Sequence, residues 1–309
     1  MKKRILFSLF SLVMTSITAQ EKISETVTYN LPVKTIKINS ETIAYADEGD
    51  GDKTLLFVHG LSSNLDSWKK NIAGLKSDFR AIAIDLPGYG KSSRRKTDYS
   101  LAEYAGILND LVQKMDLKNV TLVGHSMGGQ IAMHSVLKYP ETYKRLILIA
   151  PAGIETFTEQ EATLMKNSYT PAMVMAASDE QVLANYKMNF YSFPEDAQGM
   201  VDDRIAMKSS KDFSDYAETV VNNIHAMLEE PVINEVDEIE VPVLMIFGNN
   251  DMLIPNKYFH PSESIDSLIE TSKKKFNNIE VKTIDEAGHF VNFEQPEKVN
   301  QEIGDFLKE

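Results

Sequence analysis

The sequence contains no cysteine. It can therefore form no disulfide, carry no lipidated N-terminal cysteine, and offer neither a thiol nucleophile nor a thiolate metal ligand. Long apolar runs are equally scarce, since nothing beyond the first 20 residues is long and apolar enough to span a bilayer. Internal repeats and low-complexity linkers are missing as well. The stability of the protein must come from core packing.

Basic residues are also fewer than acidic ones. The 309 residues carry a formal net charge of −13, with 43% hydrophobic and 25% charged residues. An acidic surface repels nucleic acid and anionic membranes, so neither is an expected partner. The length allows one large α/β domain with an insertion, or two smaller domains.

The first 20 residues have the layout of a signal peptide. Residues 1–4 are basic, residues 5–17 are apolar with only Ser and Thr among them, and Ala19 supplies a small residue for cleavage. The apolar run is short for a transmembrane span. We expect a bacterial signal peptide over residues 1–20, no stable membrane anchor after its removal, and a periplasmic or extracellular protein. An uncleaved anchor is the alternative.

Apolar segments of strand length alternate with segments that have helical spacing. Residues 34–39 and 42–46 predict a half-exposed antiparallel hairpin. The segments expected as buried strands are 53–58, 80–85 and 120–123, and further strands are expected at 145–150, 241–247 and 280–284. Strands that alternate with helices predict an α/β fold with a mostly parallel sheet and helices on both faces.

The alternation stops between residues 154 and 235. This stretch has a helical composition and is rich in Met and aromatic residues. We interpret it as a helical cap inserted into a core formed by residues 21–153 and 236–309. Its flexible Met side chains suit an adaptable apolar pocket, although they could equally form the core of the cap itself.

A candidate nucleophile lies where a strand turns directly into a helix. The sequence Gly124-His-Ser-Met-Gly128 fits G-x-S-x-G, between a β-branched run and a helix-compatible segment. A side chain at either glycine would crowd this tight turn. The motif predicts that Ser126 is a nucleophile, provided that the chain supplies a base and an acid.

The base and the acid should follow other strands, because ligands bind at the carboxyl ends of parallel strands. His289 lies in a loop after the last strand, and Asp251 follows the strand that ends at about residue 247. His59 and Asp85 also follow strands, but we expect both to organise loops. The catalytic set is therefore predicted as Ser126, Asp251 and His289, in an established triad order.

Acyl transfer also requires N–H donors for the oxyanion. We expect the backbone N–H of Met127, directly after the nucleophile, to be one donor. The N–H of Leu61, after His59-Gly60, is the simplest second donor, with Ser62 as the alternative.

Taken together, these segments resemble the α/β-hydrolase superfamily over essentially the whole mature chain. The resemblance rests on His59-Gly60, Asp85–Ser92, Gly124–Gly129, Phe247–Asp251 and Gly288–Phe290. It implies an eight-stranded sheet, a helical lid after the sixth strand, and neither a cofactor nor a metal.

The resemblance leaves several activities open. An aspartate nucleophile, as in haloalkane dehalogenases and epoxide hydrolases, is absent. So are the elbow of proline iminopeptidases and the His-Gly-Gly-Gly loop of one lipase and esterase group. Export favours a serine esterase or lipase with a small-molecule ester or lipid substrate. A meta-cleavage-type C–C hydrolase and a small-ligand binder that retains a slow triad are the alternatives.

Overall fold

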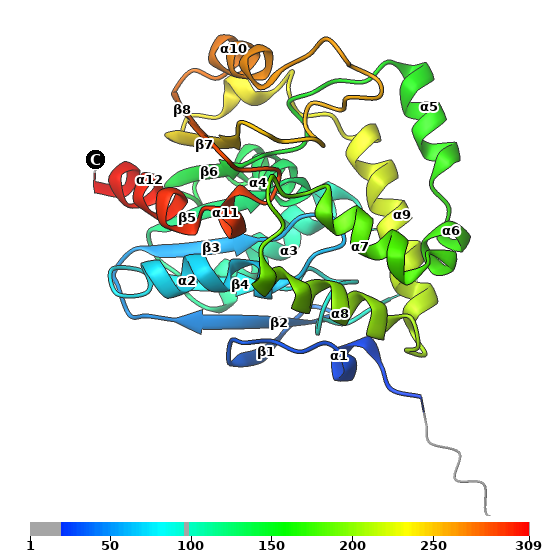
Figure 1. Cartoon of the computed structure of the whole chain (residues 1–309). Coiled ribbons are helices and arrows are strands. Elements are labelled where there is room, and N and C mark those ends of the chain that lie inside the picture. The colour runs from blue at the N-terminus through cyan, green and yellow to red at the C-terminus, as the bar shows by residue number, and fades with distance from the viewer. Residues whose placement is uncertain (1–19, 96–98, 309) are drawn as a thin grey trace, which may run out of the picture.

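The computed structural model describes residues 20–95 and 99–308, so the predicted signal peptide lies outside it except for Gln20. These residues form one eight-stranded sheet in the order β1-β2-β4-β3-β5-β6-β7-β8 (Figure 1). Its strands are β1 (Val33–Ile38), β2 (Glu41–Glu48), β3 (Thr54–Val58), β4 (Arg80–Ile84), β5 (Val120–His125), β6 (Arg145–Ile149), β7 (Val243–Gly248) and β8 (Ile279–Ile284). β2 runs antiparallel to β1 and β4, and the other five pairings are parallel. The predicted eight-stranded, mostly parallel α/β fold is confirmed.

The central strands are largely apolar because helices cover both faces of the sheet. Every residue of β3, β5 and β7 is buried, whereas the edge strands β1 and β8 are partly exposed. Helices α2 (Lys69–Leu75) and α12 (Pro296–Lys308) pack on one face, and α3 (Leu101–Lys114), α4 (Met127–Lys138) and α10 (Ile265–Lys275) on the other. Such double coverage explains continuous apolar strands in place of alternating ones.

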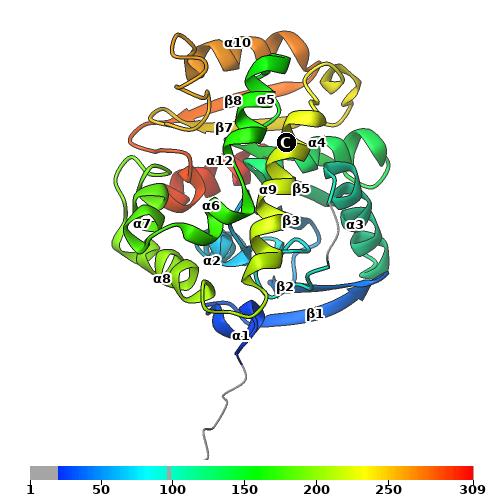
Figure 2. The same cartoon turned by 90° about the vertical axis from the view of Figure 1, so that its right-hand side faces the viewer.

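Every regular element between β6 and β7, a stretch that the structure describes throughout, is helical. These elements are α5 (Glu159–Ser168), α6 (Pro171–Ala176), α7 (Asp179–Lys187), the 3₁₀ turn η2 (Glu195–Ala197), α8 (Gln198–Met207), α9 (Phe213–Glu229) and the 3₁₀ turn η3 (Val236–Glu238). In Figure 2 helices α5 to α9 lie in front of the sheet and cover one of its edges. The limits 154–235 of the cap stay a prediction.

Three short helical elements complete the fold: α1 (Ile23–Thr26), the 3₁₀ turn η1 (Leu65–Trp68) and α11 (Val291–Glu294). Among the described residues, no helix combines the length and the apolar character that crossing a membrane requires.

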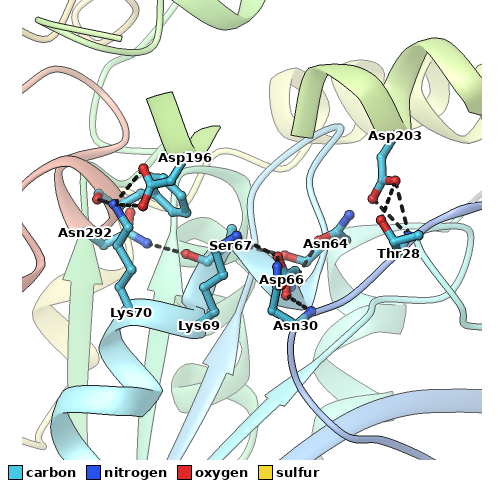
Figure 3. A network of polar contacts seen from close by, with 11 residues as sticks. Thr28, Asn30, Asn64, Asp66, Ser67, Lys69, Lys70, Asp196, Asp203 and Asn292 are labelled. Carbon is cyan, nitrogen blue, oxygen red and sulfur yellow. Dashed lines mark hydrogen bonds and ion pairs between the residues drawn. The ribbon is translucent and has the colours of Figure 1, made fainter. Parts of the chain in front are cut away.

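Polar contacts hold the cap against the core (Figure 3). The Asp203 carboxylate on α8 accepts hydrogen bonds from the backbone N–H and the hydroxyl of Thr28, at 3.1 and 3.0 Å. Lys70 on α2 forms an ion pair of 2.8 Å with Asp196 in η2. Two different core segments therefore fix the position of α8 over the sheet.

Candidate active site

Ser126 occupies the turn between β5 and α4, with a strained backbone. Its φ of 53° and ψ of −120° lie in a region that residues with side chains rarely adopt. A Cβ on Gly124 would approach the carbonyl oxygen of Gly128 to 2.2 Å, and one on Gly128 would approach that of Val58 to 2.3 Å. Because a side chain at either position would clash with these carbonyl oxygens, both flanking residues must be glycine. The turn lifts the serine out of the sheet edge.

Asp251 and His289 meet from two neighbouring strand ends. His289 Nδ1 donates a hydrogen bond of 2.8 Å to Asp251 Oδ2, and both side chains are buried. The other carboxylate oxygen accepts from the backbone N–H groups of Leu253 and Ile254, at 2.8 and 3.0 Å. These bonds fix the carboxylate and leave Nε2 of the imidazole with its lone pair free.

Ser126 and His289 line the same cavity, which has a volume of about 500 Å³. The Ser126 hydroxyl does not, however, form a hydrogen bond with His289 or with any other described residue. Catalytic hydrogen bonds are often long in the free enzyme and shorten when substrate is bound. The arrangement thus provides a half-exposed serine beside an oriented histidine–aspartate pair.

Of the two predicted oxyanion donors, Leu61 lines this cavity, and Met127 directly follows Ser126, which also lines it. Within the described part of the chain, neither the N–H of Leu61 nor that of Met127 donates to a protein acceptor. Met127 is the first residue of α4, so the positive end of the helix dipole reinforces its N–H. Ser62, the alternative donor, lines an adjoining cavity. The roles of Leu61 and Met127 stay predictions.

His125 was missed as a contributor to the site. Its Nε2 donates a hydrogen bond of 3.0 Å to the carbonyl oxygen of His289, and the two rings lie 4.9 Å apart. Burial holds the pKa of His125 well below its usual value, so its imidazole is neutral. The motif could not reveal this contact, because G-x-S-x-G accepts any residue at that position.

Glu155 is a second residue that the sequence left unnoticed. It lines the cavity, pairs with His260, and accepts a hydrogen bond of 2.8 Å from the N–H of Asn256. Desolvation by burial raises the pKa of Glu155. Glu155, His260 and Glu263 place potential metal ligand atoms within 4.8 Å of one another. The ion pair with His260 already accounts for the position of Glu155.

His59 and Asp85 organise loops, as expected from the sequence. His59 Nδ1 donates to the carbonyl oxygen of Gly60 at 2.8 Å, and Nε2 accepts from the N–H of Leu86 at 3.1 Å. Asp85 accepts from the N–H groups of Leu65 and Lys91, both at 2.7 Å. Both side chains are fully buried. They connect the loop that carries Leu61 to the loop after β4.

The burial of His59 predicts a specific loss of stability in acid. Desolvation lowers the pKa of His59 from 6.5 to about 4, so its contribution is complete above pH 6.5 and is lost as the pH falls through 4. That difference corresponds to about 3 kcal/mol. Asp85 has the opposite sign, because burial raises its pKa to about 6 and acidification stabilises its folded form.

Replacing His59 by Gln removes only the first of these contributions. Between pH 7 and pH 4, we expect the free energy of unfolding of the H59Q variant to fall by about 3 kcal/mol less than that of the wild type. Urea denaturation at a series of pH values measures this difference. Parallel pH profiles for the two proteins would contradict it.

Fold and site together define a hydrolase with a serine, a histidine and an aspartate at the strand ends. The chain belongs to the family described as alpha/beta hydrolase fold, whose model matches residues 53–296. It is accordingly an α/β-fold hydrolase.

Among its relatives is the uncharacterized hydrolase YugF of Bacillus subtilis, 24% identical over 90% of this chain and 98% of that protein. A monoacylglycerol lipase of Mus musculus is 25% identical over 82% of this chain and 75% of that protein. Of the solved structures, a probable hydrolytic enzyme of Pseudomonas aeruginosa superposes with a TM-score of 0.82, at 22% identity over 93% and 98% of the chains. An esterase of Exiguobacterium antarcticum gives a TM-score of 0.75, at 20% identity over 89% and 99%. At 22% and 20% identity, the similarity to these two solved structures shows a shared fold.

Proposed function

We propose that this hydrolase is an exported serine esterase or lipase that cleaves carboxylic esters through an acyl-serine intermediate. The observation that carries the proposal is the 2.8 Å bond between His289 and Asp251 at the same cavity as Ser126. One similar protein is named a lipase and one similar solved structure is named an esterase, and both names favour this chemistry. The basic and apolar residues 1–20 are the sole support for export to the periplasm or medium.

In the proposed mechanism Ser126 Oγ attacks the acyl carbon while His289 Nε2 accepts the hydroxyl proton. The N–H groups of Leu61 and Met127 stabilise the oxyanion that forms, by several kcal/mol in total. The histidine then protonates the leaving alcohol. A water molecule, deprotonated by the same nitrogen, releases the acid. Asp251 keeps the proton on Nδ1 throughout and stabilises the imidazolium.

The cavity suits an acyl or alcohol group of moderate size. Its volume falls within the range of small-molecule sites, and its walls include Met165, Met227 and Phe157. No cofactor is needed for this reaction.

We expect the protein to turn over p-nitrophenyl esters and to be labelled at Ser126 by a fluorophosphonate probe. A series of esters from acetate to palmitate, with initial rates and mass spectrometry of the labelled peptide, tests both. Rapid labelling without turnover of any ester would favour the ligand binder. Cleavage of vinylogous diketones alone would favour the C–C hydrolase, which uses the same three residues.

A further inference from the structure

A second cavity adjoins the one that contains Ser126. It has a volume of about 530 Å³ and lies among the cap helices α6 to α9. We call the first the serine chamber and the second the cap chamber. The two chambers share as lining residues Leu61, Tyr169, Asn189, Ile224 and Phe290. Because Leu61 is one of the two predicted oxyanion donors, an ester held there can extend one arm into each chamber.

The two chambers differ in the charged residues that line them. Among the described residues, Arg204 on α8 is the only charged one that lines the cap chamber. In the part of the chain that the structure describes, Glu155 is the only carboxylate that lines the serine chamber. Glu155 is paired with His260, whereas Arg204 has no carboxylate partner among the described residues, so an anionic group on a substrate would be attracted to the cap chamber.

Arg204 has no anionic partner in the described part of the chain. No carboxylate there lies within ion-pair distance of its guanidinium, and none of its N–H groups donates a hydrogen bond to a described residue. Its Nη1 is buried in this unpaired state. A buried N–H donor left without a hydrogen bond is costly unless a bound group or water satisfies it.

The guanidinium is nevertheless held in place. Its Cζ lies 4.4 Å from the ring centre of Tyr216 and 5.2 Å from that of Phe213, at cation–π distances. The preceding residue, Asp203, anchors α8 to Thr28 (Figure 3). Stacking on the rings leaves the in-plane edge of the guanidinium free, and its Nε and Nη2 can bind a carboxylate through two hydrogen bonds.

Tyr186 supplies a neutral donor to the same chamber. It lines the cap chamber, and its hydroxyl forms no hydrogen bond with a described residue. Burial raises the pKa of this phenol, so it stays protonated and can donate.

The geometry points to the cap chamber as a subsite for a carboxylate, in which Arg204 selects esters that carry an acidic group on one arm. This inference rests on the proposed ester hydrolysis and names its substrate class. A single guanidinium balances a single negative charge, which favours a carboxylate over a dianionic phosphate.

Binding of adipic acid monoamide, compared with the neutral diamide adipamide, tests the subsite without any turnover. By calorimetry on the wild-type protein, we expect the monoamide to bind about 10- to 100-fold more tightly, as a charge-assisted bidentate bond provides. Arg204→Met should abolish this preference, and Arg204→Lys should retain part of it. Lys187→Met removes one exposed positive charge from the neighbouring helix α7 and should leave the preference intact.

Turnover gives the second measurement. For the p-nitrophenyl monoester of adipic acid, we expect R204M to lower kcat/KM by about 10- to 100-fold, mainly through KM. The neutral p-nitrophenyl hexanoate should be cleaved at the wild-type rate, which also shows that the variant is folded. A merely structural role for Arg204 would lower both activities together.

The subsite is overturned if the wild type does not discriminate the monoamide from the diamide, or if K187M loses the preference as R204M does. If R204M does not fold, two other results test the subsite. The wild type must prefer the monoamide over the diamide, and R204K must retain part of that preference. Ester turnover without acid preference would refute only the subsite. Acid-selective binding through Arg204 without turnover of any ester would refute only the proposed function.

Discussion

Replacing Ser126 by Ala is expected to lower kcat/KM for p-nitrophenyl esters by about 10⁴- to 10⁶-fold. The substitution removes the only atom that can form the acyl bond, while the oxyanion donors and the cavity remain. Since the serine hydroxyl forms no hydrogen bond with a described residue, its loss should leave the free energy of unfolding nearly unchanged. Initial rates at saturating and sub-saturating ester, with circular dichroism on the same sample, measure both effects.

Ser135→Ala is the matched control for this experiment. Ser135 lies on the same helix, α4, and its hydroxyl donates a hydrogen bond of 2.7 Å to the carbonyl oxygen of Ile131, away from the cavity. We expect S135A to keep both its activity and its fluorophosphonate labelling. If S126A kept most of the wild-type rate, another nucleophile would be at work and the acyl-serine mechanism would be wrong.

The positions of the three predicted catalytic residues could be predicted because each depends on local sequence. Continuous apolar runs located the parallel strands, and Ser126, Asp251 and His289 each follow one of them. In a parallel sheet the residues after the strands share one edge, so their proximity required no knowledge of side-chain packing. The structure brings Asp251 and His289 together as this reasoning predicts.

The contacts that tune the site were not predictable in this way. His125 reaches the carbonyl oxygen of His289 across 164 positions of sequence. Glu155 likewise pairs with His260 across 105 positions. Each contact depends on the relative placement of two loops, which hydrophobic periodicity does not encode.

The cap shows the same limit of prediction from sequence, here for a whole segment of the chain. Its composition predicted helices and an apolar pocket, and Met165 and Met173 do line the chambers. Arg204, which has no ion-pair partner among the described residues, looks in the sequence like any other surface arginine. Only the packing of α8 against α9 turns its guanidinium toward the rings of Phe213 and Tyr216.

Replacing Asp251 by Asn is expected to lower kcat/KM for the same esters by about 10⁴-fold. The amide nearly matches the carboxylate in shape, and its oxygen can still accept from the N–H groups of Leu253 and Ile254. Its NH₂ group, however, donates toward Nδ1 of His289. The imidazole then carries its proton on Nε2, where it can no longer accept the proton of Ser126. Rates of ester turnover and of fluorophosphonate labelling should fall in parallel, because both need the activated serine.

Asp285→Asn is the control for loss of a carboxylate close to His289 in sequence. Asp285 follows β8, is exposed, and pairs with Asn249 rather than with the histidine. We expect D285N to retain the wild-type rate. A D251N variant that kept a tenth or more of that rate would show that another group orients His289. Glu155 would then be the next acid to test, because among the described residues it is the carboxylate that lines the serine chamber.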